Sequence, residues 1–366
     1  MRDPIRCWLC QHALHAGAGF VYQAWLNAAG DSGVIREPLG RWLEEHATRP
    51  GAGFVYEAWL QGDGELEVVR GPVAQWLEAH DVHPGAGFVY QAWLHAGGDL
   101  ELVADPIMRW LGEHGDDRAA RRVLKAWLVA KGDPARIGDQ FASWLRYHGT
   151  NAETRTLYQA WLDARGAIAI VRGPIARWLA EHAAARNAGW LHRSWLDAGG
   201  APDVVREPLA RWIAKHGRCA TAQFVYQTWL EATQELDFVR APIARWLQQH
   251  ARDRGAGLVY EAWLDAGGDR DLIHQAVASW LTRHACDPVA GFLYQAWLRA
   301  GGDPEAIRAW SSTTATPRGL MCTTHGSGSP PRRTTVPRAP TTPRGAAHAS
   351  QQAADDPPAP PGPRTR

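Results

Sequence analysis

The sequence predicts an all-α solenoid built from nine helix-turn-helix repeats of 34 residues, which together fill residues 1–306. Two tryptophan series carry this prediction. Nine Trp recur every 34 residues from Trp8 to Trp280, and nine more, each followed by Leu, recur at the same interval from Trp25 to Trp297. The two series lie 17 residues apart and use 18 of the 20 Trp in the chain. No insertion interrupts either series, so a single structural unit is repeated without a break.

The first half of each repeat predicts a helix. Numbering positions 1 to 34 within a repeat, apolar residues at positions 1, 5, 8 and 9, with His at position 12, follow one helix face. An acidic residue at the end of the preceding repeat, such as Asp99, Asp133 or Asp269, is a suitable N-cap. Pro at position 4, present in seven repeats, predicts either a kinked helix or a short turn followed by a helix.

The second half of each repeat predicts another helix. Positions 18, 21, 22, 25 and 26 form a second apolar stripe, and Gly at position 30 in eight repeats predicts where the helix stops. Two helices of roughly 12 to 15 residues with short connections leave no room for a strand. Because neither helix can bury its Trp-Leu face alone, the repeats must stack on one another.

The recurring Trp and His are interpreted as structural residues. Trp at helical spacing usually belongs to a core. His at position 12 can stack on the indole four residues earlier and donate to the last carbonyls of its helix. Equivalent atoms in neighbouring repeats lie ~10 Å apart, too far for two imidazoles to share a zinc ion at ~2.1 Å, so no metal site is expected. The predicted core residues are Trp8, Trp42, Trp76, Trp110, Trp25, Trp59, Trp93, Trp127, His46 and His80.

In length and helix-turn-helix plan the repeat resembles the tetratricopeptide class, while the Pro in its first helix resembles HEAT-type units. The resemblance covers residues 1–306 and concerns architecture alone. The recurrent motifs here are Pro-Leu-Ala-Arg-Trp-Leu-x-x-His and Phe-Val-Tyr-Gln-Ala-Trp-Leu, which differ from the tetratricopeptide pattern. The resemblance implies a scaffold that holds a peptide, a protein or occasionally a nucleic acid, and it transfers no ligand residues.

Binding residues are expected where the repeats differ while their frame stays constant. Positions 23 and 27 share the outer face of the second helix, and position 27 is highly variable. Repeats four and five depart most from the pattern, including Arg146 and Tyr147. The alternatives are a solvated face and simple sequence drift. The candidate binding residues are Asn27, Gln61, His95, Asp163, Asp197, Glu231, Asp265, Arg299, Arg146 and Tyr147.

The sequence predicts no catalytic activity and no cofactor. No catalytic motif occurs at a single distinctive place, where an active site in a repeating chain should stand out. Cys7 and Cys10 form Cys-x-x-Cys, but no second pair accompanies them. The Gly-Ala-Gly-Phe segment at 17–20 lacks the Lys-Ser/Thr ending of a phosphate loop. We therefore expect a non-catalytic scaffold for protein–protein interaction.

The charge distribution favours a protein or peptide ligand over a nucleic acid. The segment 307–366 holds eight Arg and two Asp, which leaves 31 basic and 36 acidic residues in the repeats. Arg at position 2, in six repeats, is the one basic row available for phosphates. A nucleic-acid-binding array is the alternative. No apolar run approaches the ~18 residues of a membrane helix, and the Cys usage fits reduced thiols, so the expected location is cytoplasmic without membrane contact.

The segment 307–366 predicts a disordered tail, because its Pro, Thr, Arg, Ala and Gly cannot build a core. A second hypothesis is a frameshifted continuation of the array. Taking the last base of each codon with the first two of the next, Met321-Cys322 forces Val, and the following steps permit Val-Tyr-x-Ala-Trp-Leu, the second-helix motif. At the other end no polar capping helix precedes the first repeat. We therefore expect a recognition arm or fragment of a larger protein, with uncapped apolar ends that favour end-to-end self-association.

Overall fold

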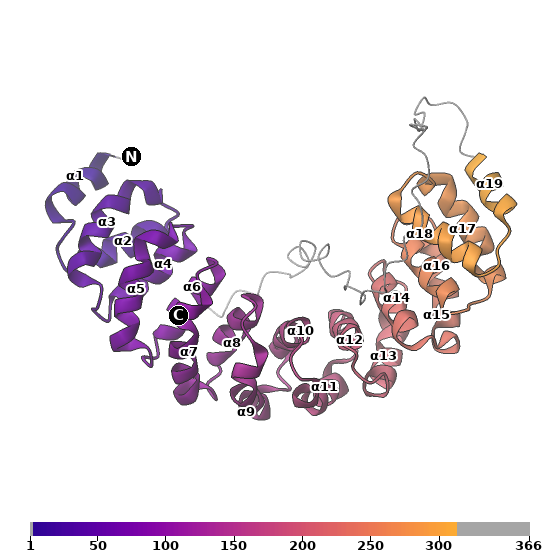
Figure 1. Cartoon of the computed structure of the whole chain (residues 1–366), viewed down its shortest axis with the longest axis horizontal. Coiled ribbons are helices and arrows are strands. Elements are labelled where there is room, and N and C mark those ends of the chain that lie inside the picture. The colour runs from indigo at the N-terminus through magenta and orange to yellow at the C-terminus, as the bar shows by residue number, and fades with distance from the viewer. Residues whose placement is uncertain (1–2, 313–366) are drawn as a thin grey trace, which may run out of the picture. The chain divides into compact units, whose positions relative to one another are not determined.

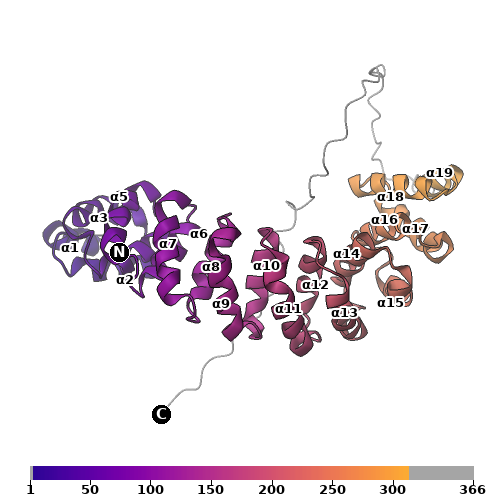
Figure 2. The same cartoon turned by 60° about the horizontal axis from the view of Figure 1, so that its bottom comes forward.

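The computed structural model describes residues 3–312, and within them it contains helices and no strand. Each repeat contributes two helices, and successive helices pack against their neighbours in sequence order (Figures 1 and 2). The predicted all-α solenoid is confirmed. None of the described helices is both long and apolar enough to cross a membrane.

In repeats two to nine the first helix is longer than the second, whereas the described helices of the first repeat have equal length. All first helices end at the His of position 12: α1 (Asp3–His12), α3 (Ser32–His46), α5 (Leu66–His80), α7 (Leu100–His114), α9 (Gly138–His148), α11 (Ile168–His182), α13 (Asp203–His216), α15 (Leu236–His250) and α17 (Arg270–His284). The second helices are α2 (Ala18–Asn27), α4 (Ala52–Gln61), α6 (Ala86–His95), α8 (Ala120–Val129), α10 (Arg155–Asp163), α12 (Ala188–Asp197), α14 (Ala222–Thr233), α16 (Ala256–Asp265) and α18 (Pro288–Arg299).

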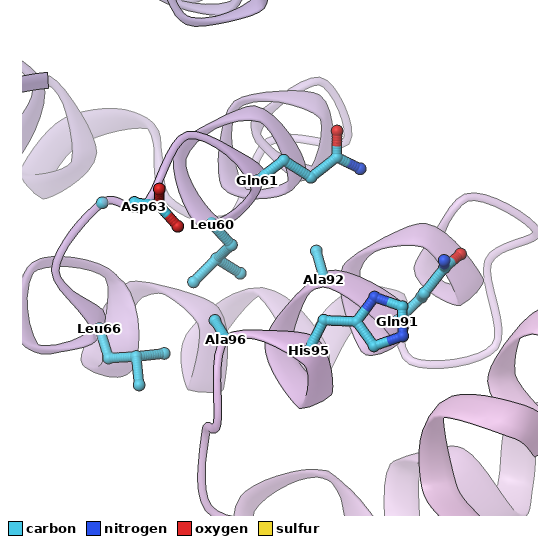
Figure 3. A pocket seen from close by; sticks show the side chains of 9 residues that line it. Leu60, Gln61, Asp63, Leu66, Gln91, Ala92, His95 and Ala96 are labelled. Atoms are coloured by element: carbon cyan, nitrogen blue, oxygen red, sulfur yellow. The ribbon is translucent and has the colours of Figure 1, made fainter. Parts of the chain in front are cut away.

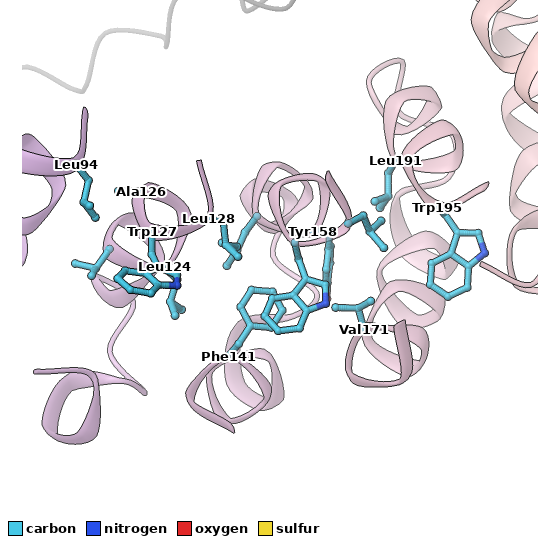
Figure 4. Close-up of a cluster of buried hydrophobic side chains, with 14 of the residues drawn as sticks. Leu94, Leu124, Ala126, Trp127, Leu128, Phe141, Tyr158, Val171, Leu191 and Trp195 are labelled. Carbon is cyan, nitrogen blue, oxygen red and sulfur yellow. The ribbon is translucent and has the colours of Figure 1, made fainter. Parts of the chain in front are cut away.

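The helices form two layers, because second helices pack mainly on second helices and first helices on first helices. For example, α4 lies between α2 and α6, while α3 packs on α5 and α11 on α13. The buried face of each layer is apolar, and one continuous core runs between them. Figure 4 shows part of it, where Trp127, Phe141, Tyr158, Val171 and Trp195 come from successive helices.

The first helices begin as predicted at some repeats and differently at others. The carboxylates of Asp31 and Asp269 accept the N–H groups of Gly33 and Asp271, and thus act as N-caps. Asp99 makes no such bond and instead accepts from Arg70. Six first helices run through the Pro of position 4 without interruption. In the fifth repeat, which lacks that Pro, the 3-10 helix η1 (Pro134–Ile137) precedes α9.

Aromatic side chains hold the connection between the two helices by hydrogen bonds to three consecutive carbonyl groups. The hydroxyl of Tyr56 donates to the carbonyl of Ala47, at position 13 of the same repeat, over 2.9 Å. From the next repeat, His80 Nε2 donates to the carbonyl of Thr48 over 2.7 Å, and Trp76 Nε1 donates to that of Arg49 over 3.0 Å. Equivalent Trp and His bonds link every pair of adjacent repeats.

This arrangement differs from the one expected for the His of position 12. Its ring does lie against the indole of position 8, with centroids 5.1 Å apart for Trp76 and His80. Its acceptor, however, belongs to the preceding repeat and not to its own helix. The stacked pair therefore joins neighbouring repeats.

The fourth and sixth repeats depart from this scheme, because Leu124 and His192 occupy the position of the Tyr. The imidazole is fully buried, and neither ring nitrogen has a hydrogen-bond partner. Burial lowers the pKa of His192 to about 3, and the positive charge of Arg211 acts in the same direction. In the next repeat, Trp212 Nε1 donates to the carbonyl of Arg186, one residue later than the equivalent acceptor elsewhere. The junction between repeats six and seven is thus irregular.

The second helices other than α14 end in a Schellman-type turn, whose geometry revises the role of the Gly at position 30. The N–H of Gly98 bonds to the carbonyl of Trp93, and that of Gly97 bonds to the carbonyl of Leu94. The left-handed residue is at position 29, where Gly97 has φ 77° and Ala29 has φ 54°. Gly98 is needed for a different reason, because a Cβ there would overlap the Trp93 indole. That indole donates to the carbonyl of Asp99 and so closes the turn.

A tenth first helix begins beyond the nine repeats. Helix α19 (Pro304–Ser312) packs on α17, so the boundary predicted at residue 307 falls inside a helix. The Trp310 ring lies 4.9 Å from that of Trp297 and 5.3 Å from that of His274, measured between centroids. Residues 313–366 lie outside the described residues. The rest of the predicted tail and the frameshift hypothesis at Met321-Cys322 fall there.

Alanine substitutions at Gly97 and Gly98 should separate the need for a left-handed backbone at position 29 from the need for space beside the indole at position 30. We expect Gly98→Ala to lower the free energy of unfolding by about 3 kcal/mol, because the new methyl group overpacks a buried indole. Gly97→Ala should cost only about 1–2 kcal/mol, the penalty of a left-handed alanine in open space. Chemical denaturation measures both. Equal losses would show that the indole does not set the requirement for glycine.

Restoring tyrosine in the sixth repeat should stabilise the protein. His192→Tyr supplies a hydroxyl that can donate to the carbonyl of Ala183, as in the seven repeats that have this Tyr, and removes two unpaired buried nitrogens. A gain of about 1 kcal/mol is expected at neutral pH, and its measure is the thermal unfolding midpoint. As the matched control, Tyr226→Phe removes the equivalent bond to Gly217 and should cost a similar amount.

The stabilities of the wild type and of His192→Tyr should differ more in acid than at neutral pH. The unfolded chain takes up a proton at His192 near pH 6.5, whereas the folded chain does so only near pH 3. The wild type therefore loses about 1.4 kcal/mol of stability for each pH unit between these values, relative to His192→Tyr. A stability difference that stays constant from pH 7 to pH 4 would contradict this assignment.

Candidate functional site

The constant frame places position 27 at the exposed C-terminal end of the second helices. All eight candidates at this position are exposed and, apart from Glu231, they end their helices; Glu231 lies in the longer α14. Because successive second helices pack side by side, these residues follow one another along a single layer. The eight are Asn27, Gln61, His95, Asp163, Asp197, Glu231, Asp265 and Arg299.

An open pocket lies between the ends of α4 and α6 (Figure 3). It has a volume of about 510 Å³, and Gln61 and His95, both at position 27, face it from adjacent helices. Leu60, Leu66 and Ala92 supply apolar lining. The carboxylate of Asp63 comes from the connection after α4. The pocket therefore combines an apolar floor with polar groups at its rim.

An equivalent pocket of about 210 Å³ lies between α14 and α16. It is again lined by position 27 of two consecutive repeats, Glu231 and Asp265, and Glu261 adds a third carboxylate. Leu230 and Ala262 form its apolar part. The same place in the repeat thus forms a pocket at both ends of the array, with different polar side chains in each.

Acidic residues of position 27 influence one another between repeats. Partial loss of hydration raises the pKa of Asp163, and the nearby carboxylate of Asp197 raises it further, while Arg193 and Arg165 lower it. Arg193 also pairs with Asp197 on the same helix, over 3.2 Å. Adjacent side chains at position 27 are therefore close enough to act together on one ligand.

Aromatic residues at position 20, present in six of the nine repeats, form a row that extends the same helix face and was not among the predicted binding residues. Phe20 is 75% exposed and Phe54 is 51% exposed. Position 20 lies seven residues before position 27, hence on the same side of the helix. The available signal was an aromatic residue outside the apolar stripe of the second helix. We call positions 20, 23 and 27 of the second helices the second-helix face.

Neighbouring repeats make contact along this aromatic row. The rings of Trp190 and Phe224 have centroids 5.7 Å apart. The guanidinium group of Arg193 lies 5.3 Å from the centre of the Phe224 ring, and that of Arg122 lies 5.4 Å from the centre of the Phe88 ring. The row is therefore continuous across these junctions, and its rings accept cations.

Two further candidates do not join this face. Arg146 and Tyr147 belong to α9, in the layer of the first helices, where Tyr147 is 68% exposed and Arg146 donates to the hydroxyl of Ser143. The structure therefore separates them from position 27. The departures in repeats four and five do not form one patch.

The predicted core residues lie inside the array. Six of the eight Trp are buried, while Trp8 and Trp25, in the first repeat, are half-buried. His46 is buried and His80 is half-buried, each in the inter-repeat contact described above. Across the described residues no cluster of three or more His, Cys, Asp or Glu is arranged to hold a metal ion. Cys7 and Cys10 are exposed on α1.

The Arg row of position 2 is largely occupied by ion pairs. Arg36 pairs with Glu65 over 2.5 Å, and Arg70 pairs with Asp99 over 2.7 Å. Arg206 and Arg240 pair with the equivalent acidic residues. These four cations lie beside the acidic residue that precedes the next first helix, which offsets their charge.

Removing the carboxylate of Asp197 should lower the pKa of Asp163. Asp197→Asn removes a negative charge that raises this pKa and releases Arg193, which lowers it. Side-chain carboxyl NMR during a pH titration measures the change. Asp265→Asn, three repeats from Asp163 along the same row, is the matched control and should leave the pKa of Asp163 unchanged. A pKa of Asp163 that stays constant or rises in Asp197→Asn would show that the two carboxylates are independent.

The comparisons with known proteins add no family to this description. No family model matches the chain, and no curated protein matches its sequence. The described helices establish a helical repeat array with sequential packing.

Proposed function

We propose that this chain is a non-catalytic scaffold for protein or peptide binding and that the second-helix face is its binding surface. One observation carries the proposal. Exposed, variable side chains meet in pockets between consecutive second helices, on a frame whose junctions all contain the same Trp and His hydrogen bonds. Binding arrays use a constant frame with variable surface positions in this way.

The proposal extends the architectural resemblance to tetratricopeptide and HEAT-type repeats, whose surfaces bind extended ligands. A cytoplasmic recognition arm of a larger protein is the setting we propose. End-to-end association of the array is a further proposal, supported by the half-buried Trp8 and Trp25 of the first repeat.

Nucleic-acid binding is the second candidate. An exposed aromatic row can stack bases, and amide side chains such as Asn27 and Gln61 can bond to base edges. The charge of the repeats opposes it, because acidic residues outnumber basic ones and the Arg of position 2 are engaged in ion pairs. Phosphate binding needs the reverse balance.

Affinity capture from lysate of the native host, at low and high salt, tests the proposed function. We expect the full chain to recover specific proteins at both salt concentrations. The double variant Phe54→Ala/Phe88→Ala, which truncates the aromatic row, should lose them. Glu44→Gln, an exposed change on α3 in the other layer, should keep them. The assignment would be overturned if only nucleic acid is recovered, and only at low salt. It would also be overturned if the wild type, Phe54→Ala/Phe88→Ala and Glu44→Gln capture the same proteins equally well.

A further inference from the structure

We infer that the second-helix face binds an extended, cationic peptide in the polyproline II conformation, with a Lys or Arg at every third residue. This inference rests on the proposed function and specifies its ligand. It follows from the spacing of the repeats, the chemistry of the two pockets and the aromatic row.

The spacing of the helices matches the period of this conformation. Packed helices lie ~8–10 Å apart, so equivalent positions on consecutive second helices recur at about that interval. A polyproline II helix has three residues per turn and rises ~3.1 Å per residue, so every third side chain points the same way after ~9.3 Å. Such a peptide can offer one side chain per repeat. An α-helical ligand rises only ~5.4 Å per turn, which does not match.

The pocket between α4 and α6 suits a long cationic side chain. Its floor of Leu60, Leu66 and Ala92 can cover the methylene stem of a Lys or Arg, and the carboxylate of Asp63 lies at its rim. The pocket is also at the C-terminal ends of two helices, where the helix dipoles place partial negative charge. An anionic side chain would meet the wrong sign of charge from both sources.

The pocket between α14 and α16 repeats this chemistry five repeats further along. Glu231, Glu261 and Asp265 surround an apolar floor, again at two helix C-terminal ends. Two pockets with the same charge in separate parts of the array favour a ligand whose positive charges are distributed along its length. Arg193 of repeat six and Arg299 of repeat nine pair with Asp197 and Asp265, whereas repeat four carries two cations on this face, Arg122 and Lys125, at positions 20 and 23. The ligand is therefore expected to bind on either side of that repeat.

The aromatic row provides contacts for the backbone and the Arg side chains of the peptide, in addition to those made by the pockets. Aromatic-lined grooves bind polyproline II segments, whose backbone is already ordered before binding. The rings of Phe20 and Phe54 are the most exposed of the row. The protein's own Arg193 and Arg122 already lie over rings of this row, and a ligand Arg can use the remaining ring faces in the same way.

The test uses fluorescence anisotropy with the full chain and three synthetic peptides of equal length. The first repeats Pro-Pro-Arg, the second has the same composition with all Arg at one end, and the third repeats Pro-Pro-Glu. We expect the periodic Arg peptide to bind at least tenfold more tightly than the clustered one, although their charges are equal. The Glu peptide should not bind. Equal affinities for the two Arg peptides would overturn the inference, as would tighter binding of a single-stranded RNA of matching length.

Variants locate the binding on the face. Asp63→Asn, which keeps a residue that tolerates the left-handed conformation found there, and Glu231→Gln should together weaken the periodic peptide about tenfold. Glu44→Gln, the matched change in the other layer, should bind normally, and thermal unfolding shows that each variant is folded. Unchanged affinity in the double variant would overturn the inference.

The two proposals fail in different ways. If no peptide binds, but Phe54→Ala/Phe88→Ala still loses its captured proteins, the ligand class is wrong and the scaffold function stands.

Discussion

The array depends on one interaction: hydrogen bonds from aromatic side chains to the carbonyl groups that connect the two helices of each repeat. A helix end leaves its last carbonyls without partners, and burial of such groups is costly. Here the next repeat supplies the donors, because His80 and Trp76 reach the carbonyls of Thr48 and Arg49. Each repeat thus satisfies the polar backbone of the one before it. Stacking buries apolar surface and completes hydrogen bonding in the same step, which fixes the register between repeats more tightly than apolar packing alone.

This interaction also explains how the second-helix face varies at little cost to the fold. The side chains of positions 8, 12, 22 and 25 point between the layers or toward the connections, while positions 20, 23 and 27 face outward. Substitutions at the outer positions leave the donors untouched. Neighbouring repeats can therefore carry Asn27, Gln61 and His95 at one equivalent place and keep the same backbone. The side chains at positions 20, 23 and 27 of the second helices can therefore change with little effect on the stability of the fold.

Much of the fold could be predicted from the sequence, because the 34-residue spacing of the Trp residues equals the length of the structural repeat. The end of each first helix at His and the exposed location of position 27 follow from helical periodicity alone. The acceptors of Trp76 and His80 could not be predicted, since they lie 27 and 32 residues earlier and depend on how repeats stack. Gly98 shows the same limit, because its requirement comes from an indole that folds back over the turn. On the binding side, the variable residues were identifiable, whereas the pockets and the exposure of Phe20 and Phe54 arise only when adjacent helices are packed.

The departure at His192 has a consequence for the cooperativity of the whole molecule. In a linear array each repeat contacts only its neighbours, so the chain unfolds in blocks whose limits are its weakest junctions. The sixth repeat lacks the tyrosine bond, buries an unpaired imidazole and shifts the acceptor of Trp212. We therefore expect repeats seven to nine to open as a separate block across that junction while the preceding repeats stay folded. Acid acts first at this boundary, because it charges an imidazole that the folded junction keeps neutral.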